Sequence, residues 1–252
     1  MLTRPTIFDV PLDPVTLSSA LDRAEAALAG QRLFHVVTPG PEFLMAAHAN
    51  RKFRAVLQRA DLSLPDGFGV IMAAWWLGLE RLSRVTGMDF VRGLAARAAV
   101  KGYRLFLFGG ASGVVARAAA ALVREFPGIR IAGVESGVRG WVRLPDALVS
   151  WRIRRAQPDI LLVALGAPKQ ELWIDRHRAQ LGRVRLVVGV GGVFDYLAGA
   201  VRWPPRLVRL LGLEWLWRLV LQPRQRWQRI VTATWRFARE VLREKRRPHA
   251  VG

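Results

Sequence analysis

Residues 159–174, DILLVALGAPKQELWI, hold the pattern that decides the fold. The run from Asp159 to Pro168 is continuous and apolar, and it ends in turn residues, which is typical of a strand buried on both faces. The segment 169–180 that follows is helical in composition, and Pro168 suits the first turn of a helix. A buried strand that leads directly into a helix is the repeating unit of parallel α/β sheets.

The same alternation continues on both sides of this segment. Short runs rich in Val, Ile and Leu predict strands at 33–38, 61–67, 104–110, 129–137 and 183–192, and helical patterns predict helices at 14–29, 42–59 and 114–126. The expected fold class is α/β, with a Rossmann-like, mostly parallel sheet covered by helices on both faces. Trp75 and Trp76 are expected in the core, on the helix after Asp66.

Polar and glycine-rich turns follow the predicted strands. The carboxyl ends of parallel strands share one edge of the sheet, where α/β proteins bind their ligands. These turns are therefore expected to converge on one site, and they are Thr38, Pro65-Asp66-Gly67, Gly109-Gly110, Glu135-Ser136-Gly137, Gly166-Ala167-Pro168-Lys169-Gln170 and Gly191-Gly192.

Each of these turns has a structural and a functional interpretation. Asp66, in PDGFG, is either an ordinary turn aspartate before glycine or a general base at a strand end. Lys169 and Gln170 mark either a plain helix start or a helix N-terminus that faces an anionic ligand. The glycine pairs match neither a P-loop nor a dinucleotide fingerprint, and tight strand-to-helix turns explain them equally well.

Composition restricts the class of protein. The 252 residues are 52% hydrophobic, with a mean hydropathy of +0.17, which favours one sizeable globular core. There is no cysteine, no HExxH motif and no Asp-x-Asp pair, so neither disulfides nor a metal site nor a cofactor is expected. The N-terminus lacks an apolar signal region, and no uncharged apolar stretch of about 18 residues predicts a membrane span.

The C-terminal segment differs in composition from the rest. Residues 202–247 contain twelve Arg and one Lys against three Glu, a net of ten positive charges, and five of the ten Trp. A basic, helix-compatible, Trp-containing segment suits an anionic membrane surface. The expected organisation is an α/β catalytic domain at 1–200 and a basic, Trp-rich helical appendage at 201–252, with Trp203-Pro204-Pro205 at the boundary.

Together the motifs resemble the WecG/TagA/CpsF family, glycosyltransferase family 26, over about residues 6–230. The ordered motifs that carry the resemblance are VVTPGPEFLMAA, ADLSLPDGFGVIMAA, RVTGMDF, LFLFGG, DILLVALGAPKQELWI, VGVGGVFDYLAGAVRWPPR and GLEWLWRL. The chain departs from the family at Gly40, where the family usually has Asn, and this leaves the identity of the donor sugar open.

The resemblance implies a specific reaction. Such enzymes move a sugar, of N-acetylmannosamine, N-acetylmannosaminuronate or glucose type, from a UDP-sugar to a polyisoprenoid-diphosphate-linked sugar in bacterial exopolysaccharide or cell-surface polymer biosynthesis. They invert the anomeric centre and need no metal. They act in the cytoplasm, peripherally on the inner face of the plasma membrane, so an anionic membrane surface is an expected partner.

The resemblance also implies roles for residues. Asp66 matches the family's proposed base, and Thr38 and Gln170 complete the catalytic set. An inverting transfer requires one base and charge stabilisation on the leaving UDP, which arginines can supply without a metal. The expected substrate-binding residues are Gly67, Gly109, Gly110, Glu135, Gly166, Pro168, Lys169, Asp195, Arg206, Arg218 and Arg224.

Two other classes remain as alternatives. The net charge of +20 and the mixture of Arg and Trp are also typical of a nucleic-acid-binding protein. A nucleotide-sugar-binding protein without activity is the other alternative, and the presence of Asp66 argues against it. The polar sheet edge is not required for nucleic-acid binding, so no nucleic acid is expected as a partner. Homo-oligomerisation is left open.

Overall fold

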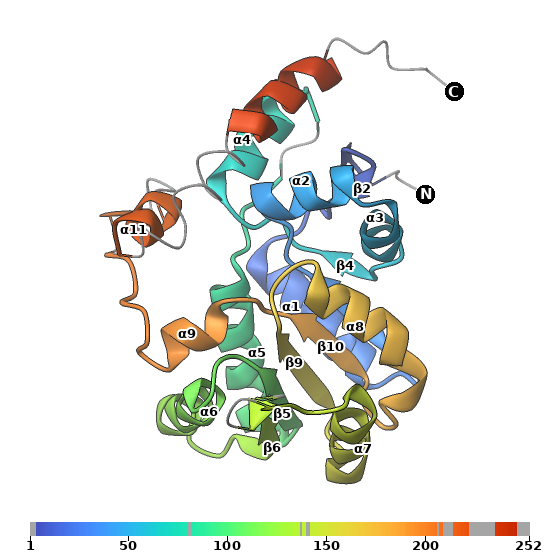
Figure 1. The fold of residues 1–252 in the computed structure, drawn as a ribbon, viewed down its shortest axis with the longest axis vertical. Coiled ribbons are helices and arrows are strands. Elements are labelled where there is room, and N and C mark those ends of the chain that lie inside the picture. Colours follow the sequence, from blue (N-terminus) through green and yellow to red (C-terminus); the bar gives the residue numbers. More distant parts are fainter. Residues whose placement is uncertain are drawn as a thin grey trace.

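A six-stranded sheet, parallel throughout, forms the centre of the molecule. The computed structural model describes residues 4–79, 82–136, 138–139, 142–205, 207–208, 214–221 and 235–245. The strand order is β4-β3-β10-β9-β5-β6, so the chain runs outward to both edges before its last two strands fill the middle (Figure 1). The strands are β3 (Phe34–Val37), β4 (Leu62–Ser63), β5 (Arg104–Gly109), β6 (Arg130–Glu135), β9 (Ile160–Ala164) and β10 (Leu186–Gly189).

Helices cover both faces of this sheet. The alternation of side chains along β5 sends Leu105 and Leu107 to one face and Phe106 and Phe108 to the other. On the first face pack α1 (Leu17–Leu28), α5 (Gly87–Lys101), α6 (Val114–Glu125) and α9 (Val193–Leu197). On the second face pack α7 (Asp146–Ala156), α8 (Lys169–His177) and the residues after the short helix η1 (Arg178–Gln180). The predicted α/β class, with helices on both faces, is confirmed.

A separate apolar cluster lies beyond the carboxyl end of β3. It joins α2 (Pro41–Ala49), α3 (Arg51–Gln58) and α4 (Phe68–Trp76) to the hairpin of β1 (Thr6–Ile7) and β2 (Val10–Pro11). A helix at residues 235–245 adds its buried Phe237 and Val241 to the same cluster. A C-terminal helix therefore returns to the body beside α4, at the top of Figure 1. The remaining elements are β7 (Val138–Arg139), β8 (Val142–Arg143) and α11 (Glu214–Leu221).

The segment 42–59, predicted as one helix, is two helices. Asn50 leaves the helical conformation, with φ −127° and ψ 102°, and its side chain accepts a hydrogen bond from the Phe53 N–H at 3.1 Å. Asn is a strong N-cap residue, so it ends α2 and starts α3. Apolar periodicity continues across the break, which is why the sequence pattern does not reveal it. The helices α5 and α7 are not predicted from the sequence pattern.

The expectation that Trp75 and Trp76 lie in the core is wrong. Their exposed fractions are 69% and 43%. The helix α4 is apolar all round, a composition that usually indicates burial. Only the side of α4 that carries Val70, Ala73 and Ala74 packs against the body, because the helix lies at the periphery.

None of the helices in the described residues combines the length and the apolar composition that a membrane span requires. Of the appendage arginines expected to bind substrate, Arg206 and Arg224 lie outside the described residues. Arg218 belongs to α11, but its side chain also lies outside the described part of the chain.

Candidate active site

The turns after β3 and β4 are tied together and place Asp66 beside Thr38. The Asp66 N–H donates to the Pro39 carbonyl at 3.0 Å, and the Leu64 N–H donates to the Val37 carbonyl at 2.8 Å. The partly buried Asp66 carboxylate accepts a hydrogen bond from the Gly87 N–H, at 3.0 Å to Oδ2. Asp66 therefore lies at the N-terminus of α5, where the helix dipole favours negative charge.

Gly87 marks the point where three elements meet. A Cβ atom built on Gly87 would lie 3.5 Å from Asp66 Oδ2, 3.7 Å from Thr38 Cγ2 and 3.6 Å from Val193 Cγ2. The two residues predicted from different turns, Thr38 and Asp66, therefore share one small volume with the start of α9. A carboxylate held here, next to the backbones of Gly67 and Gly87, has the geometry to accept a proton from a hydroxyl group.

Thr38 connects this volume to the central strand β10. Its hydroxyl group is buried and donates to the Gly189 carbonyl at 3.3 Å. Because this bond uses the Thr38 proton, the hydroxyl oxygen is oriented by the end of β10. The bond ties the turn after β3 to the end of β10.

Gln170 is buried and joins two of the predicted turns. Its Oε1 accepts hydrogen bonds from the Gly166 N–H at 3.1 Å and from the Gly191 N–H at 3.0 Å. Its Nε2 donates to Glu171 Oε1 at 2.7 Å. With both ends of the amide engaged, Gln170 acts as a positioning residue for the turns after β9 and β10. Pro168 is the N-cap of α8, and Lys169, the first helical residue, is exposed.

Glu171 is a functional candidate that sequence reasoning missed. It is fully buried, and burial raises the pKa of its carboxyl group from 4.5 to about 8. A Cβ on Gly189 would collide with Glu171 Oε1 and lie 2.7 Å from Gln170 Nε2, so a larger residue there would have to displace both side chains. In a sequence, an acidic residue in the first turn of a helix usually indicates a surface residue that interacts favourably with the helix dipole. Only the packing reveals that Glu171 lies in the interior.

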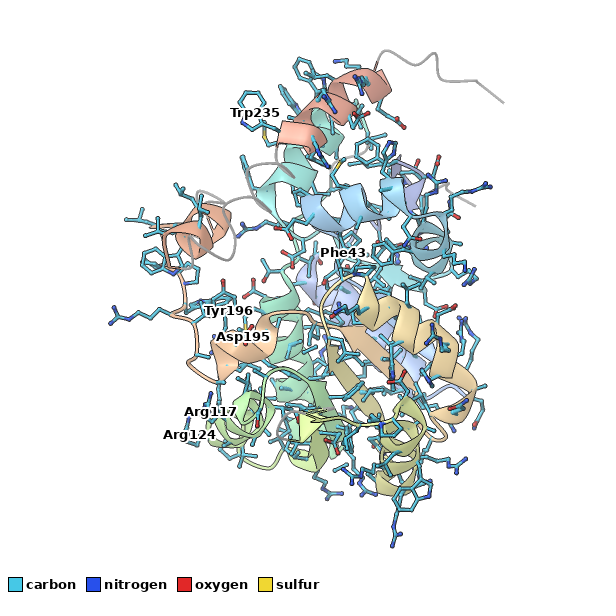
Figure 2. All side chains as sticks on the ribbon, viewed as in Figure 1. Phe43, Arg117, Arg124, Asp195, Tyr196 and Trp235 are labelled. Carbon is cyan, nitrogen blue, oxygen red and sulfur yellow. The ribbon has the colours of Figure 1, made fainter. Side chains whose placement is uncertain are left out.

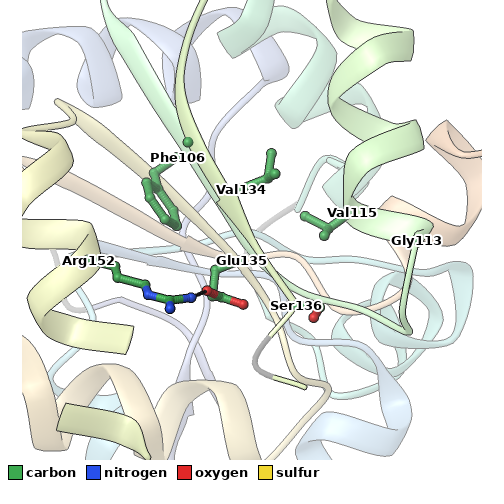
Figure 3. Close-up of a pocket in the computed structure, with 8 residues that line it drawn as sticks. Phe106, Gly113, Val115, Val134, Glu135, Ser136 and Arg152 are labelled. Carbon is green, nitrogen blue, oxygen red and sulfur yellow. Dashed lines mark hydrogen bonds and ion pairs between the residues drawn. The ribbon is translucent and has the colours of Figure 1, made fainter. Parts of the chain in front are cut away.

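A second group of predicted residues lies toward the β5 and β6 edge. A cavity of about 370 Å³ is lined by Glu135, Ser136, Arg152 and Gly113, with apolar walls from Phe106 and Val115 (Figure 3). Arg152, on α7, forms an ion pair with the buried Glu135 (Figure 3). A Cβ on Gly113 would lie 3.3 Å from Arg117 Nη1, so a second guanidinium group lies at the start of α6. The sequence pattern indicates no role for either arginine.

The glycines of the β5 turn have a clear packing role. A Cβ on Gly109, whose φ is +106°, would lie 2.5 Å from the Ala164 carbonyl oxygen. The Gly110 N–H donates to the same oxygen at 2.9 Å. The turn is therefore built for close approach to β9, and a ligand here would contact groups other than this N–H.

The remaining predicted residues lie at the same sheet edge. Gly67, with φ +102°, is the N-cap of α4, and Gly166, with φ +74°, has open space where a Cβ would lie. Asp195 is partly buried on α9 beside Tyr196 (Figure 2), whose ring packs edge-on against Trp203 at 4.8 Å.

The structure thus links one part of the predicted site directly. Hydrogen bonds and close contacts connect Asp66, Thr38, Gly189, Gln170 and Gly166 into one network. Gly110 follows β5 and Glu135 ends β6, so they lie two and three strands away from β10. In the described part of the chain, no group of three or more His, Asp or Glu side chains is placed to hold a metal ion.

Comparisons with known proteins find one matching family and several similar proteins. The sequence pattern of the Glycosyl transferase WecG/TagA/CpsF family matches residues 5–251. An N-acetylglucosaminyldiphosphoundecaprenol N-acetyl-beta-D-mannosaminyltransferase of Bacillus spizizenii (strain ATCC 23059 / NRRL B-14472 / W23) is 36% identical over 86% of this chain and 83% of its own. Proteins of the same name from Bacillus subtilis (strain 168) and Staphylococcus aureus (strain NCTC 8325) are 34% and 30% identical, over 96% and 89% of this chain and 92% and 85% of their own.

The family match covers both the Asp66 network and the returning C-terminal helix. The similar proteins align over most of their own length, so the likeness is not confined to the sheet. The chain belongs to the WecG/TagA/CpsF family and is a glycosyltransferase.

Proposed function

We propose that the protein transfers a sugar from a UDP-sugar to a polyisoprenoid-diphosphate-linked sugar, with inversion at the anomeric carbon and without a metal ion. The observation that carries the proposal is the Asp66 carboxylate, held by the Gly87 N–H at the start of α5 beside Thr38. The names of the similar proteins support a diphosphoundecaprenol-linked N-acetylglucosamine as acceptor and N-acetylmannosamine as the transferred sugar. Gly40 leaves the transferred sugar open to N-acetylmannosaminuronate or glucose.

In the proposed reaction Asp66 is the general base. Its carboxylate takes the proton of the acceptor hydroxyl group as that oxygen bonds to the anomeric carbon of the donor. The bond from the anomeric carbon to the β-phosphate oxygen breaks on the opposite face, and UDP leaves with the electron pair. Thr38 and Gln170 keep the turns after β3, β9 and β10 in register around the reacting carbon.

The donor is proposed to lie along the carboxyl edge of the sheet. Its sugar lies near Asp66, and its nucleotide lies toward Gly109, Gly110 and Glu135. The cavity between Glu135 and α6, with Arg117 and Arg152 nearby, supports an anionic ligand on that side. Gly67, Gly166, Pro168, Lys169 and Asp195 complete the proposed donor and acceptor contacts.

Residues 201–252 are proposed to form an appendage to the catalytic domain of residues 1–200. Arg206, Arg218 and Arg224 are proposed to stabilise the charge on the leaving UDP, in place of a metal. The net of ten positive charges in residues 202–247 supports peripheral docking on the anionic, cytoplasmic face of a bacterial plasma membrane.

One assay tests the proposed function. The full chain is incubated with radiolabelled UDP-sugars and a lipid-diphosphate-linked N-acetylglucosamine, with and without EDTA, and labelled lipid is measured. Transfer that persists in EDTA, with inversion seen by NMR of the product, is expected. Loss of transfer in EDTA, with recovery in Mg²⁺ or Mn²⁺, contradicts the metal-free reaction. No transfer with any donor, together with tight binding of nucleic acid, favours the alternative of a nucleic-acid-binding protein.

A further inference from the structure

We propose that α4 and the helix at residues 235–245 form one membrane-docking surface, and that α4 is the element that enters an anionic phospholipid bilayer. This assigns an apolar docking element to the body of the protein, outside the basic appendage. The inference rests on the proposed function in two respects, which are that the acceptor is lipid-linked and that Asp66 is the base.

The first observation is a continuous apolar stripe on α4. Phe68 and Met72 are 46% and 43% exposed, and with Trp75 and Trp76 they recur at the spacing of one helix face. These four side chains are called the α4 face. No residue of α4 is charged. Single exposed apolar residues are normal on a protein surface, but several large ones gathered on one face mark an interaction surface.

The second observation is that the helix at 235–245 is anchored beside this stripe. Phe237 packs edge-on against Phe8, with ring centroids 5.9 Å apart, and approaches Gly69 of α4. This burial turns another side of the helix outward. Trp235 is 75% exposed and projects away from the body (Figure 2), and with Leu242, Ala238, Arg236 and Arg239 it lines a groove of about 340 Å³.

The third observation is the position of the cations. Lys245 places its ammonium group 4.3 Å above the Trp76 ring, at the border of the α4 face. Arg236, Arg239 and Arg243 are exposed on the same helix, and the last two form ion pairs with Glu240. Tryptophan rings bordered by cations suit the interface of an anionic bilayer, where rings lie at headgroup depth and cations meet lipid phosphates.

The same charges disfavour a second copy of the chain as the occupant. In a two-fold dimer each patch would face its own copy, so the cations around both α4 faces would be brought together. The chain already carries a net charge of +20, which adds to the repulsion. An anionic bilayer removes this cost and covers the apolar rings.

The α4 face also begins beside Asp66, the proposed base. Asp66 and Gly67 directly precede Phe68, the first residue of both α4 and the α4 face. Docking through α4 therefore holds the Asp66 carboxylate close to the headgroup layer. A diphosphate-linked sugar can then reach the base while its isoprenoid chain stays in the bilayer.

Vesicle binding tests the surface directly. The full chain and the double variant Met72→Glu/Trp75→Glu are sedimented with vesicles of phosphatidylcholine, with and without phosphatidylglycerol. The matched control is Val123→Glu/Trp151→Glu, which alters two similarly exposed apolar side chains on α6 and α7. The α4 variant is expected to bind anionic vesicles about tenfold or more weakly, and the control is expected to bind like the unaltered chain.

Two further measurements separate the possible outcomes. Transfer to an acceptor embedded in vesicles is expected to fall much more than transfer to a short-chain, water-soluble acceptor. Binding by the α4 variant equal to that of the unaltered chain overturns the proposal, as does equal weakening in the control. Sedimentation velocity tests whether the α4 face is instead a subunit interface. A dimer of the unaltered chain that becomes a monomer in the α4 variant, while vesicle binding is retained, shows such an interface and also overturns the proposal. If the unaltered chain transfers no sugar, the proposed function fails while the vesicle result stands.

Discussion

The Asp66 carboxylate accepts a hydrogen bond from the backbone N–H of Gly87, at 3.0 Å, across 21 residues of chain. This contact places an acid from the turn after β4 at the N-terminus of a 15-residue helix. It also explains why the two motifs PDGFG and RVTGMDF occur together, since one supplies the carboxylate and the other the N–H that orients it. The glycine leaves space beside Asp66 that any larger side chain would fill.

Replacement of Asp66 by Asn is expected to reduce turnover by roughly 10²–10⁴-fold, the usual contribution of a general base. The Asn side-chain oxygen can still accept the Gly87 N–H, so circular dichroism and UDP binding should change little. Asp22→Asn, at an exposed aspartate on α1, is the matched control. Near-normal turnover of the Asp66 variant would contradict its role as the base.

Replacement of Gln170 by Ala is expected to destabilise the fold and to lower kcat. The change leaves the Gly166 and Gly191 N–H groups without their acceptor, at a cost on the order of 2–5 kcal/mol in the free energy of unfolding. Denaturant titration measures this, with the exposed Gln180→Ala as control. Unchanged stability with reduced turnover would instead assign Gln170 a direct contact with substrate.

The pKa of about 8 for Glu171 predicts how stability depends on pH. Folding favours the protonated carboxyl group, because its pKa lies above the unfolded value of 4.5. The contribution of protonated Glu171 to stability is therefore complete below about pH 4.5 and is lost as the pH rises to about 8. Between these values the free energy of unfolding falls by up to about 1.4 kcal/mol per pH unit.

Glu171→Gln cannot ionise, so the difference in stability between this variant and the unaltered chain should increasingly favour the variant from pH 5 to pH 8. Thermal unfolding at both pH values measures it. His35, whose burial lowers its pKa to about 4, contributes equally to both proteins and cancels in the comparison. A difference that stays constant over this range would show that Glu171 is ionised when folded.

Replacement of Gly40 by Asn tests the departure from the family pattern. Gly40 is the N-cap of α2 and makes no side-chain cap, so Asn is expected to stabilise the helix start by a few tenths of a kcal/mol. A Cβ at position 40 would lie 3.1 Å from the Asp66 carbonyl oxygen, so the new side chain must begin beside the proposed base. We expect the ratio of kcat/KM values between UDP-sugars to change. Equal changes for every donor would show that position 40 does not select the sugar.

Truncation separates the proposed roles of the appendage. A chain ending at residue 234 loses the buried Phe237 and Val241, so it should be less stable and bind membranes weakly while still transferring sugar to a soluble acceptor. A chain ending at residue 200 also lacks Arg206, Arg218 and Arg224, and it should lose transfer altogether. Full transfer by the shorter chain in detergent would show that the appendage serves only in docking.

Several features of the site follow from the sequence. The apolar runs at 159–168 and 183–192 predict buried strands, and these are β9 and β10, which the structure places in the middle of the sheet. The turns that carry Thr38, Asp66 and Gln170 are predicted at strand ends, and parallel strands bring those ends to one edge for a simple geometric reason. The resemblance to the family, which also rests on sequence, predicts a glycosyltransferase, and the family match confirms this.

The role of each polar group, however, depends on contacts between distant segments. The two-residue strand β4 and the single Asn50 that ends α2 leave too short a pattern to predict. Gln170, expected among the catalytic residues, has its amide occupied by Gly166, Gly191 and Glu171.

The sequence by itself determined the layered α/β sheet, the edge that carries the site and the family, because these depend on hydrophobic periodicity and local turn chemistry. The tertiary structure decided which groups are buried. It placed Glu171 in the interior, where its pKa rises, and left Trp75 and Trp76 on the surface, where composition had placed them in the core. Burial depends on which face of a helix packs against another element. That element can come from a distant part of the chain, as the helix at 235–245 does where it packs in the same cluster as α4.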